Sequence, residues 1–263
     1  MKSALAALAV PVLGGVAGLA MLGAPVTYLL TNFAALAIAA AWIAFGHAPK
    51  GARGRHLVLA VLLAMLFVPL LTGPEQVGIA RWLPLGPVTL HAGMLVFPAI
   101  ATLAAREREH AALILSVALF AAFLQPDAAT GFAVVFAAVG LHDVSKDWRV
   151  GLVAIVGFFA SIVMALRGQL PPAPFVERLL IYSAGDNWMA VTSMSLALGM
   201  GFCLIFATRL AREQRFALAG ALFGFIVTAL MAHYPTPLVG YGAAPILGIG
   251  LALGLRSKKK GAP

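Results

Sequence analysis

The sequence predicts an all-α bundle of about ten transmembrane helices, and three observations support this fold class. Of its 263 residues, 62% are hydrophobic and only 10% are charged, and the mean hydropathy is +0.99. Soluble domains average about 45–50% apolar and about 25% charged residues, so this chain has too few charges to cover a water-exposed surface. Its apolar residues form long runs instead of short alternating segments, which favours helices over a β-barrel.

Short polar breaks divide the apolar runs, and each run is interpreted as one helix. The expected helices cover about residues 3–21, 25–46, 56–72, 88–105, 110–124, 130–142, 149–166, 187–208, 216–232 and 241–255. Because a span needs ~20 residues, the short fifth and sixth helices are either two spans or a re-entrant pair around Pro126. No soluble-domain linker or clear internal repeat is present, so residues 1–263 are expected to form a single transmembrane domain.

The distribution of Lys and Arg predicts that both termini lie in the cytoplasm. With this orientation, Arg81, Arg167 and Arg178 are the only outer members of the 18 Lys and Arg residues. Basic residues concentrate in the short cytoplasmic loops of multi-pass proteins, so the net charge of +9 is a topology signal. No patterned basic and aromatic surface indicates nucleic-acid binding. The terminal basic cluster, residues 256–260, holds the last helix end inside or contacts anionic lipid.

The first apolar run has two interpretations. Residues 1–25 combine Lys2, an apolar stretch and small residues near Gly23, as a secretory signal peptide does. The apolar stretch is longer than a usual signal-peptide core, which favours an uncleaved first span. Cleavage would leave nine helices with the same loop orientation. The single Cys203 excludes a disulfide framework and a cysteine-based metal site.

The polar residues that attract attention lie in the predicted outer segments. Asp127 follows Pro126 between two apolar runs, where an unpaired carboxylate would cost several kcal/mol. It therefore caps the helix that starts near Thr130, faces water, or serves as a cavity carboxylate. Asp186 opens the eighth helix and is either another N-cap or a general base at the membrane surface.

Three further outer residues have alternative roles. Arg81 beside Trp82 suits an interfacial anchor, or a phosphate contact through the bidentate guanidinium fork. Glu177 and Arg178 are expected on a short amphipathic interfacial helix from Pro174 to Tyr182, as part of a solvated face.

Several site classes find no support in the sequence. The six His residues are scattered without i, i+4 pairs, so no metal site is expected. No nucleotide-binding glycine loop or nucleophile elbow is present. Ion-coupled transport would need charged residues within the spans, and these are nearly free of charge.

Four segments, in order along the chain, resemble motifs of the SEDS family (shape, elongation, division and sporulation), the RodA/FtsW type of cell-wall glycosyltransferase. They are residues 80–90 (ARWLPLGPVTL), 124–130 (LQPDAAT), 147–151 (DWRVG) and 236–244 (TPLVGYGAA). The family's ten-helix topology with both ends inside the cell also matches the expected topology. The resemblance covers about residues 56–255.

The resemblance implies a function in peptidoglycan synthesis at the bacterial cytoplasmic membrane. Family members polymerise lipid II, a polyprenyl-pyrophosphate-linked disaccharide, and work with a transpeptidase of the class B penicillin-binding type. By resemblance, Asp186 is the expected catalytic base, and Arg81, Trp82, Asp127, Arg178 and Tyr241 are expected to bind substrate. A divalent cation bridging the pyrophosphate is one option, with no metal site on the protein itself.

A non-catalytic SEDS-like scaffold is the competing interpretation. The family's Q-P-S-E sequence is replaced by His91-Ala-Gly-Met94, and the hydroxyls of its S-Y-G-G-S-S sequence are missing around Tyr241. The chain is also shorter than typical members, chiefly in the outer loop before the eighth helix. Such a protein would keep the helices and bind a partner or lipid through the outer groove without chemistry. A geometric expectation accompanies the resemblance: Arg81, Asp127 and Asp186 should line one outward-opening cavity.

Overall fold

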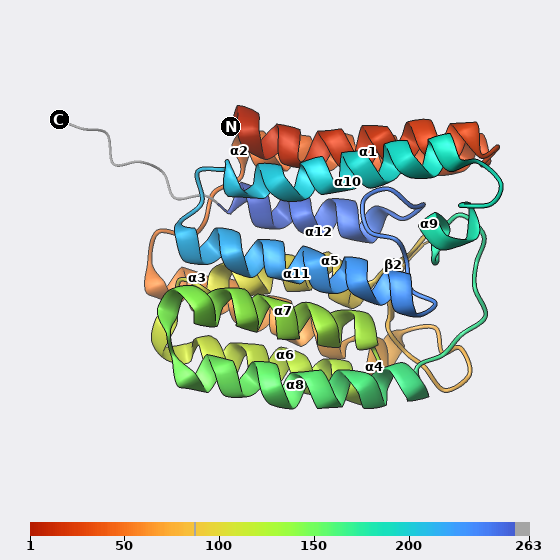
Figure 1. Ribbon diagram of the computed structural model, residues 1–263. Helices are drawn as coiled ribbons and strands as arrows, with labels where there is room; N and C mark the ends of the chain where they lie inside the picture. The colour runs from red at the N-terminus through yellow and green to blue at the C-terminus, as the bar shows by residue number, and fades with distance from the viewer. Residues whose placement is uncertain (87, 256–263) are drawn as a thin grey trace.

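The computed structural model describes residues 1–86 and 88–255 of the chain, and over these residues the protein is a bundle of roughly antiparallel helices (Figure 1). The expected terminal basic cluster lies outside the described residues. The helices are α1 (Lys2–Met21), α2 (Val26–Phe45), α3 (Ala52–Phe67), α4 (Pro69–Thr72), α5 (Ala92–Ala104), α6 (Ala111–Leu124), α7 (Ala128–Ser145), α8 (Trp148–Arg167), α9 (Leu179–Tyr182), α10 (Trp188–Phe206), α11 (Arg212–Met231) and α12 (Ala243–Gly254). A 3₁₀ turn, η1 (Arg108–His110), precedes α6.

All ten expected helices are present in the described residues, and seven of them are long and apolar enough to cross a membrane. These seven are α1, α2, α3 with α4, α7, α8, α10 and α11. Helices α5, α6 and α12 are shorter, at 13, 14 and 12 residues. Helices α6 and α7 pack against each other and run between the two ends of the bundle (Figure 1), which favours two spans over the re-entrant pair around Pro126.

Helix α5 and helix α12 lie at the centre of the bundle and join its two halves. One half packs α3, α6 and α7 against α5, with α8 outside them on α6 and α7. The other half packs α1 and α2 against α12, with α10 on the far side of α1. Every residue of α5 except Leu95 is buried. A helix that is apolar on all sides has no face to present to water, so α5 is suited to this interior position.

The outer surface of the helices is apolar, as lipid contact requires. Leu71, Leu166 and Leu196 are 85%, 77% and 70% exposed. Exposed apolar side chains on this scale would associate in water but are satisfied by lipid tails.

Two expected helical segments are wrong. The fourth helix was expected from residue 88, but Val88–His91 is strand β2, paired antiparallel with β1 (Trp82–Leu85). The β-branched Val88 and Thr89 favour a strand, and Gly86, with φ of 61°, reverses the chain between the strands. The helix expected from Pro174 to Tyr182 is reduced to the single turn α9, because Phe175 and Arg178 have positive φ angles of 63° and 48° that interrupt a right-handed helix.

The connections alternate between the two ends of the bundle (Figure 1). The β-hairpin, the turn before α7, α9 and the loop before α12 lie together at one end, which we call the hairpin end. The start of α1 and the end of α12 lie at the opposite end, which we call the terminal end. The candidate site residues Arg81, Asp127 and Asp186 belong to the hairpin end, as their common sequence assignment predicts.

Candidate functional site

The β-hairpin places two candidate side chains opposite each other. Trp82 and His91 are direct cross-strand partners, and the backbone N–H of Ala92 donates to the carbonyl of Arg81 at 3.0 Å. This pairing brings Arg81, the residue before β1, next to the first turn of α5. The hairpin therefore fixes Arg81, Trp82 and His91 in one small region above the centre of the bundle.

Asp127 caps helix α7, as one of its sequence interpretations predicts. Its Oδ1 accepts the backbone N–H of Thr130 at 3.2 Å, and its Oδ2 accepts the Thr130 hydroxyl at 2.5 Å. A Cβ at Gly93 of α5 would lie 1.6 Å from Thr130 Oγ1 and 3.0 Å from Asp127 Oδ2. Glycine at position 93 thus lets α5 approach the capped end of α7 closely enough to bury the carboxylate.

His91 links Asp127 to helix α5. Its Nδ1 accepts the backbone N–H of Met94 at 3.3 Å, which caps α5. Because Nδ1 accepts, the ring proton of the neutral form is on Nε2, and this nitrogen lies 3.5 Å from Asp127 Oδ1. The polar groups of His91 are therefore directed at the helix end and at Asp127.

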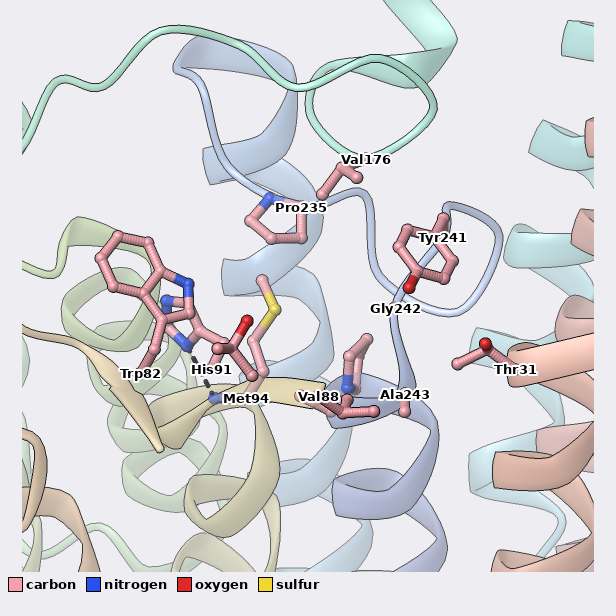
Figure 2. A pocket seen from close by; sticks show the side chains of 13 residues that line it. Thr31, Trp82, Val88, His91, Met94, Val176, Pro235, Tyr241, Gly242 and Ala243 are labelled. Atoms are coloured by element: carbon pink, nitrogen blue, oxygen red, sulfur yellow. Dashed lines mark hydrogen bonds between the residues drawn. The ribbon is translucent and has the colours of Figure 1, made fainter. Parts of the chain in front are cut away.

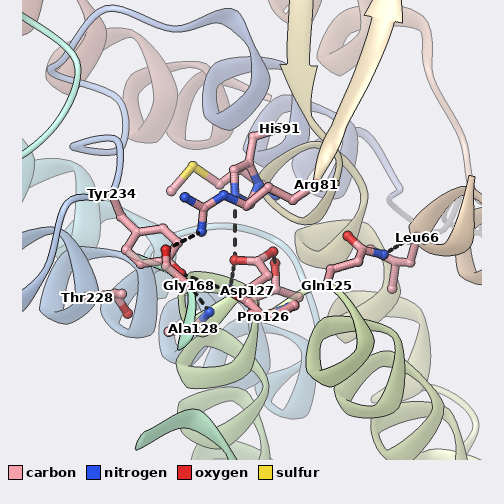
Figure 3. A network of polar contacts seen from close by, with 12 residues as sticks. Leu66, Arg81, His91, Gln125, Pro126, Asp127, Ala128, Gly168, Thr228 and Tyr234 are labelled. Atoms are coloured by element: carbon pink, nitrogen blue, oxygen red, sulfur yellow. Dashed lines mark hydrogen bonds and ion pairs between the residues drawn. The ribbon is translucent and has the colours of Figure 1, made fainter. Parts of the chain in front are cut away.

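Arg81 is a buried cation whose charge is not matched by an adjacent carboxylate. Its side chain is 1% exposed, and its guanidinium lies over the ring of Tyr234, 4.4 Å from the centroid (Figure 3). It also lies over the ring of Trp82, 5.0 Å from that centroid. Its only hydrogen bond among the described residues is from Nη1 to the Gly168 carbonyl at 3.4 Å, and Nε has none. No carboxylate of the described chain lies within ion-pairing distance of it.

Tyr234 closes the other side of this cluster. Its hydroxyl accepts the backbone N–H of Ala128 at 2.9 Å and donates to the Pro126 carbonyl at 3.3 Å. The ring thus stacks on Arg81 while its hydroxyl fixes the turn before α7. We refer to Arg81, His91, Asp127, Thr130 and Tyr234 as the buried polar cluster.

Electrostatics within the buried polar cluster keep Asp127 ionised. Burial acts to raise its pKa, but the charges of His91 and Arg81 and the hydrogen bonds from His91 and Thr130 outweigh burial and lower the pKa to about 2. Burial raises the pKa of the Tyr234 phenol to about 12. The cluster therefore holds one carboxylate and one guanidinium as fixed charges and keeps the phenol protonated as a hydrogen-bond donor.

A cavity of about 240 Å³ opens beside the buried polar cluster, and we call it the hairpin cavity (Figure 2). Trp82, His91 and Met94 line one side, and Tyr241 and the start of α12 line the other, with Thr31 of α2 at the edge. Its lining residues are Thr31, Trp82, Val88, Thr89, His91, Met94, Val176, Pro235, Tyr241, Gly242, Ala243, Ala244 and Pro245. Tyr241 is held in place by stacking on Tyr28 of α2, with ring centroids 3.7 Å apart.

Asp186 lines a separate cavity, and the buried Arg81 and Asp127 line neither this cavity nor the hairpin cavity, so the expectation of one shared cavity is wrong. This second cavity, of about 290 Å³, is lined by Pro172, Ala173, Pro174, Phe175, Glu177, Leu179, Tyr182, Ser183 and Asp186, and we call it the loop cavity. Residues 175–177 separate the two cavities, since Val176 lines the first and its neighbours line the second. Backbone hydrogen bonds to residues 234–241 hold this separating segment in place.

The other predicted residues of this region, Asp186, Arg178 and Glu177, lie outside the buried polar cluster. Asp186 is exposed and does not cap α10, because Asn187 does so by accepting the N–H of Ala190 at 3.1 Å. The guanidinium of Arg178 lies 5.3 Å from the Tyr182 ring centroid, outside the buried polar cluster. Burial raises the pKa of Glu177, and the backbone N–H of Ala173, which donates to it at 2.8 Å, partly offsets that effect.

Of the residues expected from the sequence to bind substrate, Arg81, Trp82, Asp127 and Tyr241 lie in this region, together with His91 and Tyr234, which the sequence did not identify as site residues. His91 is one of six histidines scattered along the sequence, yet it contacts Asp127 across 36 residues of sequence. The described residues contain no group of three His, Cys, Asp or Glu side chains that could hold a metal ion.

The comparisons with known proteins bear on the arrangement of the helices. No model of a known protein family matches the sequence, and no curated protein matches it. Among solved structures, the rod shape determining protein RodA of Thermus thermophilus is similar, with a TM-score of 0.64 at 18% sequence identity, covering 94% of this chain and 92% of that one. The chain has the RodA fold.

Two further solved structures agree with this assignment of the RodA fold. A point mutant of the same Thermus protein matches with a TM-score of 0.63 at 17% identity, over 95% of this chain and 93% of that one. A chain from a peptidoglycan synthase complex, described as coordinating polymerization and crosslinking, matches with a TM-score of 0.62 at 19% identity over 96% of both chains. The resemblance expected from the four sequence motifs is confirmed at the level of the fold, and the protein is a multi-pass membrane protein with the RodA fold.

Proposed function

We propose that the protein transfers a glycan from a polyprenyl-pyrophosphate-linked precursor such as lipid II during peptidoglycan synthesis. In this proposal the chain crosses the bacterial cytoplasmic membrane ten times, and both termini lie in the cytoplasm. The hairpin end then faces outward from the membrane. The proposal rests on the RodA fold together with the chemistry available at that end. A class B penicillin-binding transpeptidase is the proposed protein partner.

The observation that carries the proposal is the unpaired guanidinium of Arg81 behind the wall of the hairpin cavity. A buried cation is costly unless a counter-charge accompanies it. Asp127 acts on Arg81 through space, but no carboxylate of the described residues forms an ion pair or hydrogen bond with its guanidinium. A pyrophosphate in the hairpin cavity, reached by a shift of Trp82, would provide that counter-charge and take up the unused Nε donor.

The hairpin cavity is also placed for a lipid-linked donor. Helix α2 packs on α1 and α12, whereas α3 packs on α5 and α6, so these two neighbours in sequence belong to different halves of the bundle. The cavity reaches Thr31 of α2 at its edge. A prenyl chain lying against α2 in the bilayer would thus bring its pyrophosphate to Trp82, Tyr241 and Arg81.

The proposed reaction forms a bond between an acceptor sugar hydroxyl and the anomeric carbon of the donor. The bond from that carbon to the pyrophosphate oxygen breaks, and the lipid pyrophosphate leaves against Arg81. Asp186 takes the hydroxyl proton as general base, with Arg178 and Asp127 as further substrate-binding candidates. Since residues 175–177 separate Asp186 from the hairpin cavity, this segment has to shift when both sugars bind. A divalent cation bound by the pyrophosphate itself, and not by a protein metal site, would help to balance the charge of the leaving group.

Polymerisation of purified lipid II by the full chain, with and without the transpeptidase, tests the proposal. We expect Asp186→Asn to lower the rate by roughly 10²–10⁴-fold, the usual contribution of a general base. Arg81→Gln is expected to lower the rate and weaken donor binding. Glu75→Gln is the matched control, because it removes an exposed carboxylate of the hairpin end that lines neither cavity. Undiminished polymerisation by the Asp186 variant removes that residue from the role.

A non-catalytic scaffold is the second candidate, and one observation favours it. Asp186 lies outside the hairpin cavity, while Arg81 is 1% exposed beneath Trp82 and Tyr234. In this case the wild-type chain would not polymerise lipid II under either condition but would still co-purify with the transpeptidase.

A further inference from the structure

A third cavity lies at the terminal end of the bundle, remote from the buried polar cluster. It has a volume of about 450 Å³ and lies between the end of α5 with η1 and the turn that joins α10 to α11. Its lining residues are Ala105, Arg106, Arg108, Arg209, Leu210, Ala211, Glu213 and Gln214. We call it the arginine cavity, and nothing in the proposed glycan transfer uses it.

The arginine cavity carries an excess of positive charge. Three guanidinium groups line it, against one carboxylate, and that carboxylate of Glu213 is already paired with Arg108 at 2.5 Å. Neither Arg106 nor Arg209 has an ion pair or side-chain hydrogen bond among the described residues. Burial and the nearby Arg55 lower the pKa of Arg106, and Glu107 only partly offsets them. Two cations at this cavity therefore lack a counter-ion.

The neighbouring helix adds to the positive potential. Ala211, Glu213 and Gln214 belong to the cap and first turn of α11, a helix of 20 residues. The positive end of its dipole thus lies at the cavity. The amide of Gln214 is not available to a ligand. Its oxygen accepts the Ala211 N–H, and its nitrogen donates to the Thr102 carbonyl.

We propose that the arginine cavity binds the phosphate group of an anionic phospholipid. Guanidinium groups match phosphate oxygens in a bidentate fork, and basic pockets between transmembrane helices on the cytoplasmic side bind anionic headgroups. Apolar Leu210 and Ala211 line the same cavity. The α10–α11 turn joins two helices long and apolar enough to cross a membrane, so a bilayer around them would have its surface near this cavity. A lipid bound there would join α5 to the α10–α11 turn.

Native mass spectrometry of the delipidated full chain in neutral detergent tests this site. We expect dioleoylphosphatidylglycerol to bind more tightly than dioleoylphosphatidylcholine. At about 1 kcal/mol for each basic residue near anionic lipid, Arg106→Gln with Arg209→Gln should weaken phosphatidylglycerol binding by about 30-fold. The control pair Lys50→Gln with Arg53→Gln removes the same charge from the terminal end without touching the cavity, and should change binding by less than about twofold.

A gain-of-binding variant guards against a loss that is caused by misfolding. Glu213→Gln removes the only acidic lining residue and releases Arg108, so it should strengthen phosphatidylglycerol binding by a few fold. Equal losses in the two double variants, or equal binding of the two lipids, would overturn the site. Displacement of phosphatidylglycerol by millimolar inorganic phosphate would show that the cavity binds a soluble anion, which would contradict the proposal of a lipid ligand.

Discussion

Asp127 remains ionised although it is 1% exposed at the junction of two apolar helices. Two hydrogen bonds from Thr130 and the nearby His91 ring offset the desolvation of the carboxylate. Hydrogen bonds to an ionised group are stronger than those between neutral groups, so this small network determines where α7 begins. The carboxylate is therefore fixed in place and available to the site only as a static charge.

The depressed pKa of Asp127 predicts that stability depends on pH in the acid range. The unfolded carboxyl has a pKa of 3.8 and the folded one a pKa of about 2. Because the folded value is lower, the stabilisation is complete above about pH 5 and is lost as the pH falls through the folded pKa; it amounts to roughly 2.5 kcal/mol. Thermal unfolding in detergent between about pH 2.5 and 6 should show this slope in wild type.

The Asp127→Asn variant should lose most of that slope, since asparagine still caps α7 but does not titrate. Glu75→Gln, which removes an exposed carboxylate of the same end, should retain it. A slope that persists unchanged in Asp127→Asn would show that another group carries the acid sensitivity.

The sequence indicated which individual residues to examine but not how they pair. Asp127 was recognisable because Pro-Asp-x-x-Thr is a helix-start pattern, and Arg81 because it stands beside Trp82 in a Gly- and Pro-rich segment. His91 and Tyr234 reach the same cluster from positions 36 and 107 residues away from Asp127. No local pattern encodes such contacts, since they arise only when β2 and the α11–α12 loop pack over the start of α7.

Helix boundaries were predictable where polar residues interrupt the apolar runs. They were not predictable where one apolar run contains both a strand and a helix. Leu90 and His91 look like the start of a helix by hydropathy, yet they belong to β2 because the hairpin partner lies upstream. Hydropathy also does not show which helices pack together, so the close packing of α7 on α11 was not predictable from it. Helix contacts in membranes depend on small residues that allow backbones to approach, and glycine occurs too often in this chain to mark one interface.

Gly220 and Gly224 create that interface, and their substitution should separate α7 from α11. A Cβ at Gly220 would lie 2.1 Å from the Phe136 carbonyl oxygen, and a Cβ at Gly224 would lie 2.4 Å from that of Phe132. Because a backbone atom cannot rotate away, Gly220→Ala should destabilise the protein by about 1–3 kcal/mol. The midpoint of thermal unfolding in detergent measures this loss.

Gly199→Ala is the matched control in a neighbouring helix. A Cβ at Gly199 of α10 meets nothing within 4 Å, so alanine should be neutral or stabilise the helix by roughly 0.5–1 kcal/mol. Equal destabilisation by both variants would mean that general helix propensity, and not the α7–α11 contact, decides the outcome.

For the bundle as a whole, composition was sufficient to predict a polytopic helical protein, and the order of the helices was sufficient to place the outer segments at one end. The pairing of helices distant in sequence was not predictable. Helix α1 packs along α10, and α7 packs along α11, because the apolar faces of all these helices are nearly interchangeable in sequence. The tertiary arrangement therefore depends on shape, through small residues and close approaches, more than on hydropathy.

The orientation of the bundle follows from charge and leads to a prediction about both ends. The hairpin end holds Arg81, Arg167 and Arg178, of which Arg81 is buried. The terminal end holds the basic loops near residues 50–55, 106–108, 146–149 and 209–215. Since short basic loops are retained in the cytoplasm, the hairpin end should be outside. In a Cys203→Ala background, Glu75→Cys should react with a membrane-impermeant maleimide in intact cells, and Lys50→Cys should react only after the membrane is opened.

Both engineered positions are exposed, so a difference in labelling reports the side of the membrane and not burial. Labelling of Lys50→Cys in intact cells, with Glu75→Cys protected, would show that the protein has the opposite orientation in the membrane. It would then place the hairpin cavity on the cytoplasmic side, where the outer-face glycan transfer proposed for Arg81 and Asp186 has no acceptor, and it would move the arginine cavity to the outer leaflet. Labelling therefore tests the orientation on which the proposed function depends, before any activity is measured.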